Sequence, residues 1–399
     1  MTMRERPGES RWARIQRDLG HRLSKRLFDE LSKDPSSIRQ RRSSGLFSWS
    51  LSLAYAISIL VYGLSLAFGL LGLALVIPPW NTIFDPMLAA VLMLLCWTAR
   101  PRMVAPPYYM LSRTEFPTLY ALSDRIANAL RTRPVRGIAY SAEFGANYRQ
   151  AGLTSRPYIE LGAPLLAILD NEERLALLAH ELSHGANGDP LRSSFLSGAV
   201  NTLASWGTSF RPEAIGSLGK GLPYGAIVSL LGIPIDLLML AFSELVLLAA
   251  KALLLLVLRQ SQRAEYLADR LAASVAGSRE MQEALEKTYF GNIVDQALRA
   301  HALAAPYEPI GSKILQAASA VMPVDVEALR SESLSSQWQV DSTHPPTALR
   351  VGLLGLTPAR PRPGLLSTEE GEALTHEVNR ILALSERELI NRQLEAISG

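Results

Sequence analysis

The sequence predicts a mainly α-helical membrane protein that also contains a small β-sheet. Long apolar runs alternate with segments that have the periodicity of water-soluble helices and short strands. The chain has 399 residues, of which 48% are hydrophobic, and its mean hydropathy is +0.12. This length and composition allow several membrane spans together with a sizeable soluble core.

The basic N-terminal segment, residues 1–45, is expected to stay in the cytoplasm. It carries twelve Lys or Arg, and residues 46–77 after it contain no charged side chain. This is a signal-anchor pattern, because a cleavable signal peptide has a shorter leader and a small-residue cleavage site. Anionic lipids would attract the leader, although it could equally be a polar tail that only sets topology. The net charge of +3 is too small to indicate nucleic-acid binding.

Residues 46–99 are predicted to form a transmembrane hairpin with spans at about 46–77 and 83–99. Pro78-Pro79 ends the first run, which exceeds the roughly 20 residues needed to cross a bilayer. A returning second span would place Arg100 and Arg102 on the same side as the leader. Because the second run is short, a re-entrant segment is the alternative.

Residues 100–192 are expected to form the first part of a soluble domain. From Arg113 to Arg131 the apolar residues recur with the spacing of an amphipathic helix, and short strands are expected at Val135 to Tyr148 and Tyr158 to Leu161. Asp170 and Glu173 form the pattern of a capping box that begins another helix.

The second of these helices carries the pentapeptide His180-Glu181-Leu182-Ser183-His184. Residues four apart share one face of a helix, so His180 and His184 could bind one metal ion. Glu181 could then direct its carboxylate toward a metal-bound water, as in zinc hydrolases. After His184, Gly and Asn residues favour a helix end, and Asp189-Pro190 is typical of the start of the next helix.

Residues 193–258 are predicted to form a second transmembrane hairpin, with spans at about 193–210 and 223–258. An alternative divides the last run at Pro234 into two short spans. Either topology returns Arg259 to the side of the His180 helix. Asp236, Glu244 and Lys251 are costly in hydrocarbon, so they are expected to face neighbouring helices, headgroups or a watery cleft.

Residues 259–399 are expected to complete the soluble domain. A catalytic zinc ion needs a third protein ligand, and Glu265 is the best candidate for it. Asp269 follows one helical turn later, where it could accept the other N–H of a ligating imidazole. Taken alone, this segment could be an ordinary solvated helix. Ser367 and Glu370 are predicted to cap a final amphipathic helix.

Three motifs resemble the membrane zinc metallopeptidases that include the bacterial heat-shock protease HtpX and the CAAX prenyl endopeptidases. They are HELSHGANGD at 180–189, RAEYLAD at 263–269 and THPPTALR at 343–350, and the resemblance covers roughly residues 105–355. It implies a gluzincin-type zinc metalloprotease domain interrupted by transmembrane helices. It also implies that His180, His184 and Glu265 bind zinc, that Glu181 is the general base, and that His344 is a donor to the oxyanion.

The same resemblance places a substrate-binding edge strand at Asn147, Tyr148 and Arg149. In relatives such a strand binds the substrate backbone by β-augmentation. Here Tyr148, Arg149 and Gln150 depart from the small and apolar residues expected of the family, so an ordinary hairpin is the alternative. His344, before Pro345-Pro346, could likewise be an ordinary loop histidine.

The sequence therefore favours a membrane-integrated endopeptidase with one Zn²⁺ per chain. It would hydrolyse membrane or misfolded proteins in the bacterial cytoplasmic membrane, with its site facing the cytoplasm, as in HtpX-like quality control. Four predicted spans favour this function over prenyl-peptide processing. A proteolytically inactive adaptor is the alternative from another class, and a transporter is disfavoured because the apolar runs show no inverted repeat. Cys96, the only cysteine, excludes a disulfide framework, and the oligomeric state stays open.

Overall fold

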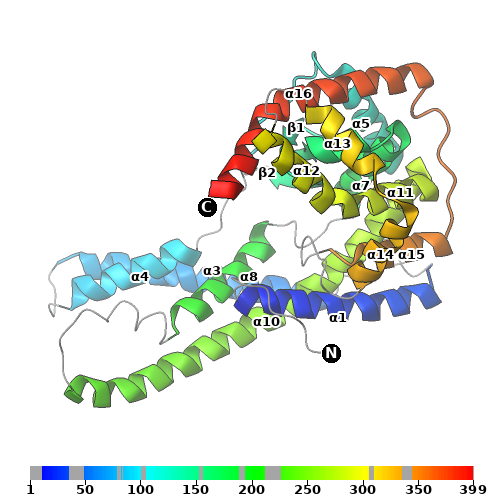
Figure 1. Ribbon diagram of the computed structural model, residues 1–399. Helices are drawn as coiled ribbons and strands as arrows, with labels where there is room; N and C mark the ends of the chain where they lie inside the picture. Colours follow the sequence, from blue (N-terminus) through cyan, green and yellow to red (C-terminus); the bar gives the residue numbers. More distant parts are fainter. Residues whose placement is uncertain are drawn as a thin grey trace.

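The computed structural model consists of a helical arm and a larger head (Figure 1). The arm contains helices α3, α4, α8 and the N-terminal part of α10, and the head contains the sheet and the remaining helices. The structure describes residues 11–35, 49–78, 82, 84–99, 105–151, 156–187, 194–211, 226–304, 310–334 and 344–398.

The described helices and strands follow one another in an order that alternates between arm and head. They are α1 (Arg11–Lys33), α3 (Trp49–Val76), α4 (Asp85–Ala99), α5 (Pro117–Leu130), β1 (Gly137–Ser141), β2 (Ala146–Ala151), β3 (Arg156–Gly162), α6 (Ala163–Ile168), α7 (Asn171–Asn187), α8 (Ser194–Ser209), α10 (Ala226–Ala276), α11 (Ser278–Lys287), the 3₁₀ helix η1 (Thr288–Phe290), α12 (Gly291–Ala304), α13 (Ile310–Ser319), α14 (Pro323–Leu334), α15 (Thr347–Leu356) and α16 (Thr368–Ser398).

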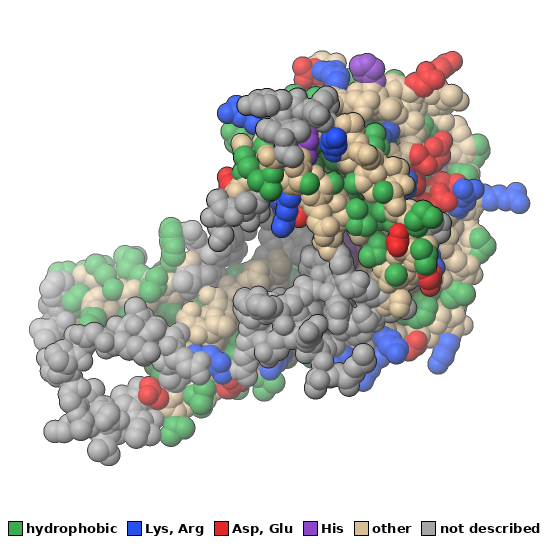
Figure 2. Space-filling view, in the orientation of Figure 1, with side chains coloured by type: hydrophobic (Ala, Val, Ile, Leu, Met, Phe, Trp, Pro, Cys, Tyr) green, Lys and Arg blue, Asp and Glu red, His purple; other side chains and the backbone are tan. Residues whose placement is uncertain are grey.

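The arm exposes apolar side chains along most of its length. Two described helical segments, Trp49–Val76 and Asp236–Ala276, are long and apolar enough to cross a membrane. In the space-filling view, most of the coloured side chains on the arm are hydrophobic, whereas most of the charged side chains lie on the head (Figure 2). Length and composition thus agree with spans in α3 and α10, while the predicted spans at about 83–99 and 193–210 correspond to the shorter helices α4 and α8.

Helix α10 connects the arm to the head without interruption. It runs for 51 residues and passes through Pro234, so the alternative that divides the apolar run at this proline is wrong. Its apolar part packs against α3 and α8, where Val246, Ala250 and Leu253 of α10 are buried in one cluster with Leu203 of α8. The same rigid helix then enters the head, and it delivers the segment around Glu265 to the protein interior.

The head contains a three-stranded sheet with the strand order β1-β3-β2. Strands β1 and β3 are parallel, whereas β2 pairs antiparallel with β3 and forms one edge. The single strand expected from Val135 to Tyr148 is therefore two strands, because a turn at residues 142–145 reverses the chain. Gly162 permits this turn, since a Cβ atom there would lie 1.9 Å from the carbonyl oxygen of Glu143.

Helices α5, α6, α7, α11, α12, α13 and α16 enclose the main core of the head. The predicted apolar stripe of α5 is buried as expected, although the helix begins at Pro117 rather than at Arg113. Glu377 of α16 accepts hydrogen bonds at 2.8 Å from the backbone N–H groups of Thr118 and Leu119, at the start of α5. The last helix thus joins the first helix of the domain.

Two predicted capping boxes are confirmed. Asp170 and Glu173 exchange side chain–backbone hydrogen bonds of 2.7 and 2.8 Å at the start of α7. Ser367 and Glu370 do the same at 3.0 and 3.2 Å before α16. Each pair satisfies backbone N–H groups that have no partner within the helix. The predicted helix start at Asp189-Pro190 lies outside the described residues.

Candidate metal centre

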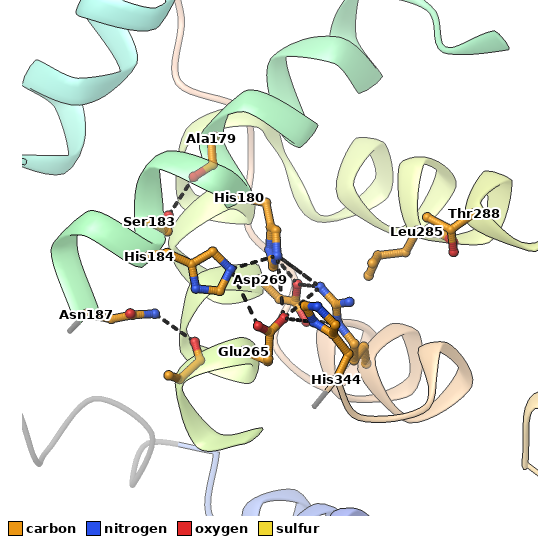
Figure 3. A network of polar contacts seen from close by, with 12 residues as sticks. Ala179, His180, Ser183, His184, Asn187, Glu265, Asp269, Leu285, Thr288 and His344 are labelled. Carbon is orange, nitrogen blue, oxygen red and sulfur yellow. Dashed lines mark hydrogen bonds and ion pairs between the residues drawn. The ribbon is translucent and has the colours of Figure 1, made fainter. Parts of the chain in front are cut away.

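Helix α7 places His180 and His184 side by side on its buried face. Their Nε2 atoms are 3.2 Å apart, and the two rings meet edge to face with centroids 4.9 Å apart (Figure 3). The exposed fractions of the two residues are 4% and 2%. The i, i+4 spacing therefore brings both imidazoles to one point, as the helical period requires.

Glu265 reaches the same point from α10. Its Oε2 atom lies 3.6 Å from Nε2 of His180, and its Oε1 atom lies 3.5 Å from Nε2 of His184. One ligand atom from each of the three residues lies within 4.8 Å of the other two. Two imidazole nitrogens and a carboxylate oxygen form a common donor set of catalytic zinc sites, so these residues fit a divalent cation.

Asp269 lies behind His180, one turn after Glu265 on α10. Its Oδ1 atom is 3.0 Å from Nδ1 of His180. A carboxylate at this distance holds the proton on Nδ1 and leaves Nε2, the nitrogen that faces Glu265 and His184, free to bind a metal. Asp269 thus occupies the position expected for a residue that orients a ligand.

Arg350 of α15 completes the network and was not predicted. It donates from Nε and Nη2 to the two oxygens of Asp269, at 2.8 and 2.6 Å. Its Nη2 atom also lies 3.3 Å from Nε2 of His180 and 3.7 Å from Oε2 of Glu265. The available signal was a single arginine within the otherwise apolar segment Thr347–Leu356.

His344 and Glu181 both line the cleft beside this network. Nδ1 of His344 is 2.8 Å from Oε2 of Glu265, and its side chain is 36% exposed, at the mouth of the site. Glu181 is 3% exposed, and it lines the same cleft as His180 and His344. Both residues are thus near the site, with Glu181 buried and His344 open to solvent.

The carboxylates make the site favourable for positive charge. Burial lowers the pKa of His180, but hydrogen bonds to Asp269 and Glu265 raise it more, to about 9. Burial raises the pKa of Glu265, yet His344 and His184 bring it well below its ordinary value. The Asp269 carboxyl also has a lowered pKa, because Arg350 outweighs the effect of burial. A field that favours an imidazolium also favours a bound cation.

A cleft of about 440 Å³ opens from the site. Asn147 and Arg149 of the edge strand β2 line it, as does Glu160 of β3, which forms an ion pair with Arg149. Tyr148 is 5% exposed on the other face of β2, with its hydroxyl against Gly185 of α7. Because side chains alternate along a strand, Tyr148 is not among the residues that line the cleft.

Comparisons with known proteins agree on one family. A model described as peptidase family M48 matches residues 137–355, more than half of the chain. A protease HtpX homolog of Pyrobaculum islandicum is 26% identical over 319 residues, which are 75% of this chain and 86% of the relative.

Two other relatives match shorter segments. A protease HtpX homolog of Pyrobaculum aerophilum is 28% identical over 212 residues, 51% of this chain and 56% of that protein. The protease HtpX of Alcanivorax borkumensis is 26% identical over 196 residues, 48% of this chain and 60% of that protein. The chain thus spans little more than half the length of these two relatives. No solved structure matches the chain.

Proposed function

This chain belongs to peptidase family M48 and has the layout of the HtpX proteases, and from this premise we propose that it is a zinc-dependent endopeptidase of the membrane. His180, His184 and Glu265 hold the metal in this proposal. The observation that carries it is the convergence of these three side chains on one point, from two helices that are distant in the sequence.

The residues around the metal have different roles in the proposed reaction. A bound zinc ion would polarise the scissile carbonyl and favour ionisation of a water molecule. Glu181 accepts the proton of the attacking water and returns it to the leaving amine. His344, at the mouth of the cleft, donates a hydrogen bond to the oxyanion of the tetrahedral intermediate. Asp269 and Arg350 keep His180 in the orientation that binding requires.

The edge strand β2 provides a place for the substrate backbone. Strand β2 pairs with β3 on one side and forms the edge of the sheet on the other, and Asn147 and Arg149 line the cleft. An extended peptide could add to this edge as a further strand and so present one bond to Glu181. The order β1-β3-β2 supports the edge-strand assignment over an ordinary hairpin inside the sheet.

We further propose that the enzyme spans the bacterial cytoplasmic membrane as two hairpins. Residues 46–99 and 193–258 form the hairpins, the basic residues 1–45 stay in the cytoplasm, and residues 100–192 and 259–399 form the catalytic head on that side. The exposed apolar side chains of α3 and α10 support this topology. Its substrates would be membrane or misfolded proteins, as in quality control.

Substitution of the general base tests this function. Full-length Glu181→Gln, in membranes and in detergent, should retain zinc but cleave casein about 10²- to 10⁴-fold more slowly. Glu172→Gln, on the exposed face of the same helix, is the matched control and should cleave like the native protein. Undiminished cleavage by the Glu181 variant would overturn the base assignment.

The inactive Glu181→Gln variant also serves to trap substrates. Polypeptides that stay bound to it in membranes, and that the native protein cleaves, would identify the substrate class. If the native protein contains zinc and binds polypeptides without cleaving them, even when they are saturating, the adaptor function is correct and the enzyme proposal fails.

A further inference from the structure

The N-terminal helix α1 packs against the two helices that supply Glu265 and Arg350 to the metal centre. It lies beside α10 and α15 (Figure 1). Leu27 and Leu31 of α1 are 2% and 0% exposed. They form one apolar cluster with Tyr266 of α10 and Leu353 of α15, and we call these four residues the α1 cluster. The described part of the basic leader is therefore a docked helix.

Polar contacts fix α1 along the part of α10 that carries Glu265. Gln262, which is 0% exposed, donates from Nε2 to the carbonyl oxygen of Gly20 at 2.9 Å. Arg270 donates to the carbonyl oxygen of Pro35, just after the end of α1. These two contacts lie on either side of Glu265 in the sequence of α10, so α1 holds the segment that carries the third metal ligand.

Tyr266 connects the α1 cluster with the metal centre. It lies three residues before Asp269, so the two side chains share one side of α10. Burial raises the pKa of Tyr266, Asp269 raises it further and Arg350 lowers it, so the phenol lies within the field of this ion pair. The hydroxyl of Tyr266 has no hydrogen-bond partner among the described residues. The ring therefore acts by packing and not by a hydrogen bond.

Leu353 makes the corresponding connection on α15. It follows Arg350 by three residues, so the two side chains lie on one side of that helix. Arg350 donates to both oxygens of Asp269, and Oδ1 of Asp269 lies 3.0 Å from Nδ1 of His180. The α1 cluster thus packs between the two helices whose spacing sets this ion pair.

From these contacts we propose that Leu27 and Leu31 are positioning residues of the metal centre. Their packing in the α1 cluster fixes the spacing of α10 and α15, and it thereby keeps Arg350 and Asp269 in the geometry that orients His180. Protein interiors are close-packed, so a cavity in the cluster lets both helices shift. The inference rests on the proposed metal centre and assigns the N-terminal helix a role in metal binding.

A zinc titration of the full-length protein in detergent tests this role. Leu27→Ala combined with Leu31→Ala should lower zinc affinity about tenfold, because removing support from a metal ligand has an effect of this size. Leu27→Met combined with Leu31→Met conserves the apolar volume and should restore native affinity. Competition with a zinc chelator, well below the unfolding temperature, measures each constant. Unchanged affinity in the double Ala variant would overturn the proposal.

A substitution elsewhere in the core separates positioning from a general loss of stability. Ile314 is fully buried on α13, which packs against α6, α12 and α16. Ile314→Ala should lower the unfolding temperature of the head, as any large cavity does, but leave zinc affinity native. If this control lowered zinc affinity as much as the double Ala variant, the effect would be general and the proposal would be wrong.

Two further variants test the route from α1 to His180. Tyr266→Phe removes only the hydroxyl and should bind zinc like the native protein, whereas Tyr266→Leu removes the ring and should bind it more weakly. In the Arg350→Leu background, the double Ala substitution should cause little further loss, because it acts through Arg350. A further tenfold loss there would contradict the proposed route.

The outcomes also distinguish this inference from the metal centre on which it rests. If the native protein binds no zinc, the metal centre fails and the role of α1 fails with it. If the native protein and the double Ala variant bind zinc equally, α1 is only a structural helix and the metal centre stands. If the double Ala variant does not fold, the same titration of Leu31→Ala decides, and native affinity overturns the proposal.

Discussion

The head and the arm place apolar side chains in opposite ways. In the head, Leu122, Ile126 and Leu178 are fully buried, and charged groups such as Asp269 are buried only with partners. In the arm, Leu60 is 71% exposed and Leu238 is 70% exposed. The difference teaches that the head is built to exclude water, whereas the exposed apolar surface of the arm is suited to contact with lipid, as the proposed membrane topology requires.

The largest expected effect is a loss of metal binding and activity in the head that leaves the membrane attachment of the arm unchanged. Glu265→Ala removes a carboxylate that lies within 3.6 Å of both imidazoles, so zinc and peptidase activity should both be lost. The arm should be unaffected, and the variant should remain in the membrane fraction after alkaline extraction. Metal analysis of the purified protein measures the first result, and full zinc occupancy would contradict the ligand assignment.

A charge on the arm tests whether lipid surrounds it. Leu60→Arg, near the middle of α3, should cost about 3 kcal/mol of membrane insertion. An exposed position in water would tolerate the same change within about 0.5 kcal/mol. Leu384→Arg, at a 52% exposed position of the head, is the control and should be neutral. Equal, small effects at both positions would show that α3 is not a span.

Substitutions of Arg350 test how strongly metal binding in the head depends on the buried ion pair between Arg350 and Asp269. Arg350→Lys keeps the charge but loses the two-pronged contact with Asp269, so zinc affinity should fall about 10- to 100-fold. Arg350→Leu should weaken binding further, because Asp269 is left buried without a cation. Competition titration with a zinc chelator measures both constants. Native affinity in the Leu variant would show that Arg350 does not position His180.

The smallest expected effect concerns the contact between α16 and the start of α5, which joins the last helix of the head to its first helix. Glu377→Gln removes the negative charge that binds the first N–H groups of α5, so unfolding of the head should become easier by about 1–2 kcal/mol. Denaturant unfolding, followed by intrinsic fluorescence, measures the change. Glu372→Gln, an exposed neighbour on α16, should leave the midpoint unchanged. Equal shifts in the two variants would mean that the contact with α5 contributes nothing specific.

Part of the candidate site could be predicted because its geometry is local. The period of an α-helix alone places His180 and His184 on one face, and the capping boxes at Asp170 and Ser367 depend only on residues three positions apart. The apolar runs likewise mark α3 and α10 without knowledge of their neighbours. Glu265 was predicted because a catalytic zinc site needs a third ligand and because Asp269 follows it by one helical turn, and the resemblance at residues 263–269 implies the same residue.

Other features depended on contacts between segments that are far apart in the chain. Arg350 and Asp269 are 81 residues apart, and nothing in the local pattern of either helix indicates that they meet. The division of Val135 to Tyr148 into two strands, and the position of β2 at an edge, follow from how β3 pairs with both neighbours.

By itself, the sequence determined which residues can bind a cation and which helices expose apolar faces, because propensity, capping and periodicity act over a few residues. The tertiary structure alone decided which carboxylate is held by Arg350, which strand forms an edge of the sheet, and that Leu177 and Leu285 line one cleft with Glu181. These features depend on packing between α7, α10, α11 and α15, and such contacts leave no periodic signal in the sequence.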